Sequence, residues 1–146
     1  MTQEDKELLL KDLCARLPYG VIVNVNGFDY DYNDKLTQIY NGYGYSIQVT
    51  TNMPYDIEQV KPYLFPLSNM TEEEFTKLKE YSGLKYNQLD LASFQNDTYK
   101  CLDFYLCEVP SYVVIRVFDW LNKNHFDYRG LIEKELAIDA TNLNFY

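Results

Sequence analysis

The chain has 146 residues, and its 22 acidic against 13 basic residues give a formal net charge of −9. This length predicts one folded unit or one domain with a small addition, and an apolar share of 47% with a charged share of 24% is typical of a folded protein. The acidity argues against duplex nucleic acid and anionic membrane surfaces as partners, because both attract basic proteins.

The cysteines and the first residues indicate a reducing compartment. Cys14, Cys101 and Cys107 form no CxxC pair and leave one thiol over in any disulfide scheme. The first six residues are acidic where a signal peptide would be basic, and no stretch approaches the roughly 20 apolar residues that span a bilayer. We therefore expect a cytoplasmic protein without a membrane-spanning segment.

The first predicted element is a helix over residues 3–17. Leucines recur at four-residue spacing from Leu9 to Leu17, whereas Asp12 falls outside that apolar face. Thr2 is the expected N-cap, and Pro18 ends the helix because it disfavours helical geometry at the residue before it.

Short strands in a meander are predicted for residues 20–67. Asn26-Gly27 and Asn41-Gly42 are typical of two-residue type I′ hairpin turns, and Asn33-Asp34 is a further expected break. The valines of the first strand alternate with other residues and are expected to share one buried face: Val21, Val23 and Val25. Because the two prolines of the last strand confine it to an edge, we predict a small SH3-like barrel or a strongly bent meander.

The second half of the chain is predicted to be mainly helical. Thr71 and Glu74 form a capping box at the start of a helix over residues 72–81. One apolar face favours another helix over residues 112–124, and residues 84–109 fit either strand or helix.

Together these elements predict an α+β protein that folds as one unit. Residues 1–67 form the N-terminal helix and the small barrel, and residues 68–146 form a mainly helical part packed on it. A last short helix from Tyr128 to Leu136 is expected, with Asp127 as its cap.

Three strings of the sequence carry a resemblance to a known group of proteins. They are KPYLFPLSNMTEEE at residues 61–74, DWLNKNHFDYRGLIEK at residues 119–134 and LLLKDLCARLPYGV at residues 8–21. In these strings the chain resembles a family of small uncharacterised proteins of gut Bacteroides-type bacteria and of their phages and mobile elements. The stretch from residue 22 to about residue 58 has no match, and the chain departs from the pattern at Asn69 and Glu135, where Ser and Gly are expected. The resemblance implies kinship and a mobile-element setting, without an established activity.

The densest polar cluster surrounds the single histidine and consists of His125, Asp127, Tyr128 and Arg129. One interpretation makes His125 a general base oriented by Asp127, or the partner of a nucleophilic cysteine. We favour a structural corner between helices, since cysteines in apolar runs are typically buried and inert. One histidine without paired cysteines excludes a zinc site of the usual composition, and no cofactor-binding motif occurs. We expect neither a metal ion nor a cofactor.

Tyrosine is the unusual component, with 15 residues. Tyrosine is enriched at protein interfaces and is also a good strand former, so both interpretations are open. The candidate binding face consists of Tyr30, Tyr32, Tyr40, Tyr43 and Tyr45. Asp29 and Asp31 alternate with these rings and are expected on the solvated face of a strand.

Three functions are consistent with these features. The favoured one is a non-enzymatic protein-interaction module of a phage or mobile element, in its concrete form an inhibitor of host defence. The second is a small hydrolase using the cluster around His125, although no nucleophile or metal set stands beside it. The third is a small-ligand or nucleotide binder in which Arg129 or Lys61 holds a phosphate.

Overall fold

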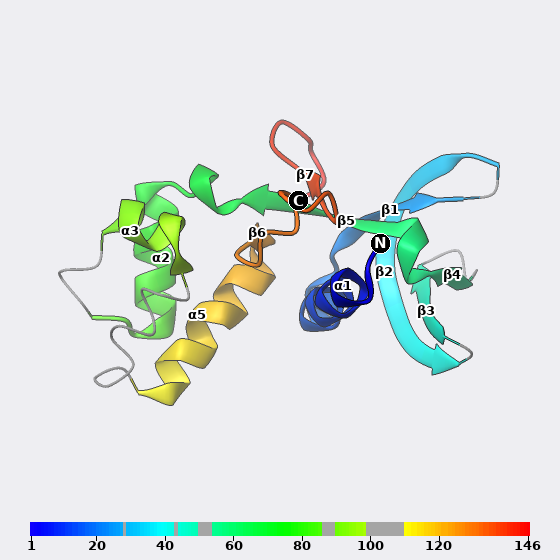
Figure 1. Cartoon of the computed structure of the whole chain (residues 1–146). Coiled ribbons are helices and arrows are strands. Elements are labelled where there is room, and N and C mark those ends of the chain that lie inside the picture. The colour runs from blue at the N-terminus through cyan, green and yellow to red at the C-terminus, as the bar shows by residue number, and fades with distance from the viewer. Residues whose placement is uncertain (28, 43, 50–53, 86–89, 99–109) are drawn as a thin grey trace. The chain divides into compact units, whose positions relative to one another are not determined.

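A computed structural model describes the chain except residues 28, 43, 50–53, 86–89 and 99–109 (Figure 1). It divides into two compact units. Unit 1 contains Met1–Phe65 and Arg129–Tyr146, and unit 2 contains Pro66–Tyr128. The sequence-based prediction grouped residues 68–146 together, whereas the last 18 residues belong to the same unit as the N-terminal helix.

Unit 1 begins with the predicted helix, α1 (Gln3–Arg16). Its capping box is present, because Thr2 Oγ1 accepts a hydrogen bond from Asp5 N at 3.1 Å and Asp5 Oδ2 accepts one from Thr2 N. The Thr2 hydroxyl also donates to Asp5 Oδ2 at 2.7 Å, and this bond, together with that from Thr2 N, holds the pKa of Asp5 below its ordinary value. The helix runs into η1 (Leu17–Tyr19) and ends at Gly20, which has a left-handed φ of 68°.

An antiparallel sheet follows α1 and is curved along its length (Figure 1). Its strands are β1 (Ile22–Asn26), β2 (Asp31–Gly42), β3 (Gly44–Val49), β4 (Pro54–Asp56) and β5 (Val60–Pro66), with η2 (Ile57–Gln59) before β5. The spatial order is β4-β3-β2-β1-β5, and β7 (Ile138–Asp139) pairs in parallel with β5. The predicted valines Val21, Val23 and Val25 are fully buried in one core with Leu9 and Leu13 of α1.

Two local predictions about this sheet were wrong. Pairing between β1 and β2 ends at Asn26 and Asp31, so more residues connect these strands than the two of a type I′ turn. The expected break at Asn33-Asp34 does not occur, because β2 continues through it. A hairpin does join β2 to β3 near Asn41-Gly42, but these two residues lie within β2 and pair with Tyr45 and Gly44, so they are not the central residues of the expected type I′ turn.

The sheet is not closed into an SH3-like barrel. Closure would require β5 to reach the far edge strand, β4. Instead β5 pairs with β1 on one side and its later residues pair with β7. The α+β class is confirmed, and the strongly bent meander describes the sheet better than a barrel.

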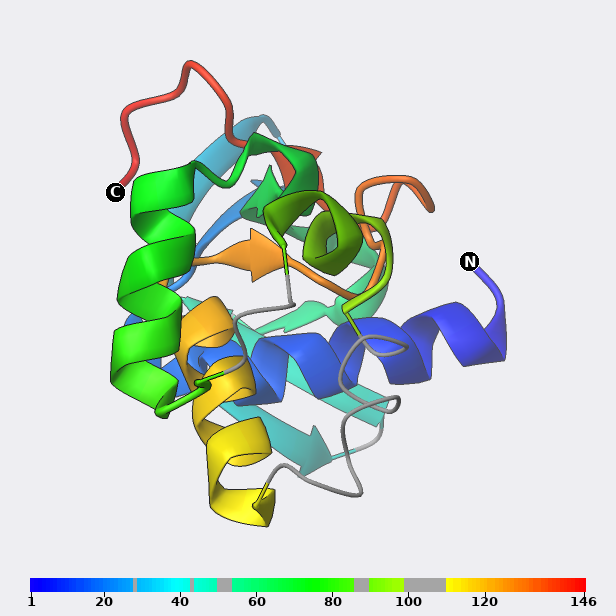
Figure 2. The same ribbon diagram turned by 90° about the vertical axis from the view of Figure 1, so that its left-hand side faces the viewer.

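Unit 2 is built on helices α2 (Glu72–Ser82), α3 (Leu91–Asn96) and α5 (Ser111–Lys123), with η3 (Leu67–Asn69) before α2 and β6 (Phe126–Asp127) after α5. α2 and α5 lie side by side (Figure 2). The capping box of Thr71 and Glu74 and the stop at Gly83, with φ of 79°, are as predicted. Residues 84–109, for which the sequence allowed either strand or helix, contain α3, and much of the remainder lies outside the described residues.

The predicted last helix from Tyr128 to Leu136 does not form. Residues 131–135 make turns, and Gly130 and Glu135 have positive φ values of 72° and 59°. Two left-handed residues within nine positions interrupt the run of helical geometry that a helix needs. Glu135 is also the position where the resemblance leads us to expect Gly.

The left-handed backbone of Glu135 gives a stability prediction. Glu135→Gly should raise the free energy of unfolding by about 1 kcal/mol, because Gly adopts this conformation without the Cβ penalty. Thermal denaturation measures the change, and Glu133→Gly, at a neighbouring exposed position whose φ is not positive, is the control that should not stabilise. A lower melting temperature for Glu135→Gly would contradict the argument.

No helix in the described part of the chain is both long enough and apolar enough to cross a membrane.

Candidate functional site

Three tyrosines of unit 1 form a connected group that we call the tyrosine surface: Tyr30, Tyr32 and Tyr55. The rings of Tyr30 and Tyr32 lie 6.0 Å apart, and those of Tyr32 and Tyr55 meet edge to face at 6.1 Å. The Tyr32 hydroxyl donates a 2.6 Å hydrogen bond to that of Tyr55, which is buried in β4. Tyr30 is 72% exposed. The group therefore presents one open ring supported by two anchored ones.

Gly27 allows Tyr30 to hold this position. A Cβ on Gly27 would lie 2.7 Å from the Tyr30 carbonyl oxygen, which is closer than real Cβ contacts allow. The chain between β1 and β2 therefore passes close to itself here, and Tyr30 follows from that approach. Asp29 and Asp31, the neighbours of Tyr30 in sequence, are both exposed, so negative charge flanks the open ring.

The other predicted tyrosines have different positions. Tyr40 is 39% exposed and lies farther along β2. Tyr43, and the side chain of Tyr45, lie outside the described residues. Sequence reasoning missed Tyr55, since only the pairing of β4 with β3 brings it to the sheet.

The predicted polar cluster around the histidine is buried and has structural contacts. His125 is 5% exposed and follows the C-cap of α5 with a left-handed φ of 60°. Tyr128 donates its hydroxyl hydrogen to Asn122 Oδ1 at 3.0 Å. Asp127 lies in β6 and caps no helix, because the helix it was expected to cap is absent.

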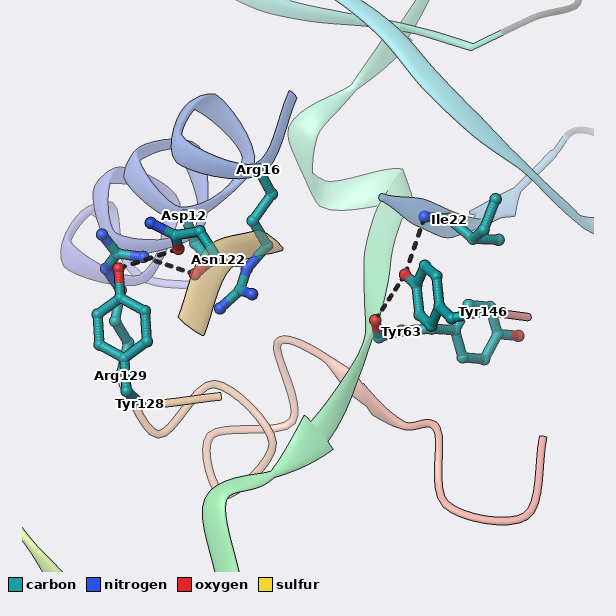
Figure 3. Close-up of polar contacts among 8 residues, drawn as sticks. All are labelled: Asp12, Arg16, Ile22, Tyr63, Asn122, Tyr128, Arg129 and Tyr146. Carbon is teal, nitrogen blue, oxygen red and sulfur yellow. Dashed lines mark hydrogen bonds and ion pairs between the residues drawn. The ribbon is translucent and has the colours of Figure 1, made fainter. Parts of the chain in front are cut away.

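Arg129 belongs to unit 1 and pairs with a carboxylate far away in sequence. Its Nη1 donates to Asp12 Oδ1 at 2.7 Å, and Arg16 Nε donates to Asp12 Oδ2 at 2.8 Å (Figure 3). Asp12 and Arg16 are fully buried, and the Arg129 side chain is 12% exposed. One carboxylate thus holds two guanidinium groups and ties residues 129–146 to α1.

The burial of this ion-pair cluster corrects the placement of Asp12 outside the apolar face. A sequence signal was present, since Asp12 and Arg16 stand at i and i+4 and so share a side of the helix. The third member could not be found by local reasoning, because Arg129 lies 117 positions from Asp12. An ion pair this closely satisfied leaves Arg129 poorly suited to hold a substrate phosphate.

Tyr146 forms a second unpredicted contact. Its hydroxyl accepts a hydrogen bond from Ile22 N and donates one to Tyr63 O, both at 3.0 Å (Figure 3). The residue is 48% exposed, because its ring faces solvent on one side while its hydroxyl lies between two strands. Burial of that hydroxyl raises the pKa of Tyr146 to about 12, against the lowering effect of the Ile22 N–H.

We call the Tyr146 hydroxyl with its bonds to Ile22 N and Tyr63 O the hydroxyl clamp. It predicts that the stability difference between the wild type and a variant without this hydroxyl depends on pH. Tyr146→Phe should lower the free energy of unfolding at pH 7 by about 1–2 kcal/mol. The reason is that Ile22 N and Tyr63 O lose their hydrogen-bond partner at a position that solvent reaches only in part. Tyr146 ionises near pH 10 when unfolded and near pH 12 when folded, so its contribution is complete below pH 10 and is lost as the pH rises toward 12. Urea titrations from pH 7 to 11.5 should show the gap between wild type and variant shrinking.

The control for this experiment is Tyr30→Phe, whose hydroxyl lies on an exposed ring. Its stability should follow that of the wild type at every pH. A gap for Tyr146→Phe that stayed constant up to pH 11.5 would contradict the clamp.

Cys14 is the cysteine that lies within the described residues. Cys14 is exposed, whereas the sequence led us to expect it to be buried. Its thiol is still partly desolvated, which raises the pKa of the thiol and so lowers the fraction present as thiolate. Cys101 and Cys107 lie outside the described residues. Within the described ranges, no three His, Cys, Asp or Glu side chains are grouped to hold a metal ion.

The geometry therefore offers three distinct features: the tyrosine surface, the buried ion-pair cluster and the hydroxyl clamp. The Tyr30 ring of the tyrosine surface is exposed, and the other two features join distant parts of unit 1. Comparisons of the chain with protein-family models, with curated proteins and with solved structures found no match.

Proposed function

We propose that the chain is a non-enzymatic protein-interaction module and that its tyrosine surface contacts the partner. The observation that supports this most is the 72% exposure of Tyr30 beside two anchored rings. Tyr32 and Tyr55 are already fixed by their mutual hydrogen bond. Binding a partner here therefore orders mainly the Tyr30 side chain, so the loss of conformational entropy is small. Aromatic anchors of this kind commonly dominate interface energies.

The charges beside Tyr30 favour a basic partner surface. Asp29 and Asp31 precede and follow Tyr30 in sequence and are both exposed, and the chain as a whole carries −9. Complementary charges accelerate the encounter of two proteins and suppress wrong partners. The resemblance to proteins of phages and mobile elements makes an inhibitor of a host defence protein, acting in the cytoplasm, the concrete form that we propose.

The test begins with capture of a partner and continues with a single substitution. A tagged chain is purified from its native host, bound proteins are identified by mass spectrometry, and the interaction is rebuilt from pure components. Tyr30→Ala should weaken binding by about 1–3 kcal/mol and change the free energy of unfolding by less than about 0.5 kcal/mol, because the ring is exposed.

The matched control is Tyr112→Ala, which removes a 58% exposed tyrosine from α5 in unit 2. It should leave the affinity unchanged. If Tyr30→Ala bound as tightly as the wild type, the tyrosine surface would be only a solvated part of the sheet.

The flanking acids should act on the association rate. Neutralising Asp29 and Asp31 to Asn should slow association and reduce its salt dependence, with little change in the dissociation rate, because exposed charges steer encounters more than they hold complexes. Stopped-flow or surface-based kinetics at two salt concentrations distinguish this from a change in dissociation.

A further inference from the structure

The pairing of β5 with β1 ends next to the position where the Tyr146 hydroxyl lies. Val60 to Pro62 pair with β1, whereas Tyr63 and Leu64 pair with β7. Continuing the antiparallel register beyond Val23 and Pro62 would place Ile22 opposite Tyr63. The Tyr146 hydroxyl stands between these two residues and bonds both.

The chemistry of this position suits a hydroxyl group. Ile22 offers a backbone N–H and Tyr63 a backbone carbonyl, each 3.0 Å from the hydroxyl oxygen. A hydroxyl group satisfies both at once, because it is a donor and an acceptor, and a phenyl ring satisfies neither. Two aromatic contacts lie beside this position. The ring centroids of Phe145 and Tyr63 are 4.3 Å apart, and those of Tyr146 and Phe65 are 5.9 Å apart in an edge-on arrangement.

The segment that carries Tyr146 is fixed mainly at its two ends. Ala140 is buried and donates to Leu64 O at 2.8 Å. The next contacts with β5 come from Phe145 and Tyr146, and residues 142–144 between them are exposed. Asn142 has a left-handed φ of 66°, which carries a backbone cost. A segment with few buried contacts opens locally more often than the sheet does.

We propose that the position between Ile22 and Tyr63 is a binding site for a tyrosine side chain that follows an aromatic residue, occupied in cis by Phe145–Tyr146 and open to a Phe-Tyr segment from outside when the tail lifts. This site is separate from the tyrosine surface and does not depend on the proposed function. The tail competes at an effective concentration in the millimolar range, as tethered ligands do. Removing its phenol should therefore expose the site to a free peptide.

The experiment uses the full-length chain and a fluorescent peptide corresponding to residues 141–146. Tyr146→Ala should bind this peptide at least about 10-fold more tightly than the wild type does, because its own tail no longer competes. The same peptide with Phe in place of its tyrosine should bind at least about 10-fold more weakly, a difference of about 1.4 kcal/mol. Fluorescence anisotropy measures both ratios, and circular dichroism confirms that the variant is folded.

Tyr146→Phe provides a second variant in case the alanine variant unfolds. It keeps the ring but removes the hydroxyl, so its tail is held less tightly and it should also bind the tyrosine peptide more tightly than the wild type. Equal affinity for the tyrosine and phenylalanine peptides, or a folded variant that binds neither, would overturn the proposal.

Discussion

Asp12→Asn should lower the free energy of unfolding of unit 1 by about 3–5 kcal/mol. The carboxylate is fully buried and is the acceptor for Arg16 and Arg129. Removing its charge leaves two guanidinium groups in the interior without their counter-charge, and a buried ion pair broken on one side is strongly destabilising. Urea denaturation combined with amide hydrogen exchange should show the loss in α1 and in residues 129–146.

Glu73→Gln is the matched control, because Glu73 and Lys77 form the same i, i+4 pair on an exposed face of α2. Water screens that exposed pair, so the loss should be far smaller than that from Asp12→Asn. A similar effect from both substitutions would show that the buried cluster contributes no more than a surface pair.

Phe94→Ala should lower the free energy of unfolding of unit 2 by a comparable amount, about 3–5 kcal/mol. Phe94 and Phe75 are 0% and 1% exposed, and their rings lie 5.2 Å apart, so the substitution leaves a cavity and removes an aromatic contact. Phe94→Leu keeps most of the volume and should cost less than about 1.5 kcal/mol. Hydrogen exchange in α2 and α3 distinguishes the two variants.

The pair of substitutions also tests the division of the chain. Asp12→Asn should reduce protection first in unit 1, and Phe94→Ala first in unit 2. Loss of protection in α2 and α3 with the Phe94→Leu variant equal to that with Phe94→Ala would contradict the cavity argument.

Local signals in the sequence predicted the helices well. α1 and α2 each begin at a capping box, and α2 ends at a glycine with positive φ, so a few adjacent residues determine each boundary. α5 followed from its single apolar face, with Val113, Val117 and Trp120 buried. Such features depend on chain geometry within one or two turns.

Features that depend on distant residues could not be predicted. The return of residues 129–146 to unit 1 rests on parallel pairing of β7 with β5, and the pairing partner is not encoded near either strand. The Asp12–Arg129 and Tyr146–Ile22 bonds each join residues more than 100 positions apart. The first hairpin was wrong for a different reason, because Asn26-Gly27 carries the turn signal but the close approach of Gly27 to Tyr30 lengthens the connection.

The candidate site was predicted in part. Tyr30 and Tyr32 do lie together, whereas the ring that anchors them, Tyr55, was not among the predicted tyrosines. The cluster around His125 was interpreted as a corner between helices, but no helix follows Asp127; His125, Asp127 and Tyr128 are buried.

The discontinuity of unit 1 has a consequence for synthesis on the ribosome. Residues 66–128 are made after the first part of unit 1 and before its last part, which takes several seconds at roughly 5–20 residues per second. During that interval Asp12 has no Arg129 and Ile22 has no Tyr146 to bond. Unit 2 is contiguous and can fold as soon as it emerges, so the unit that begins the chain is the last to be completed.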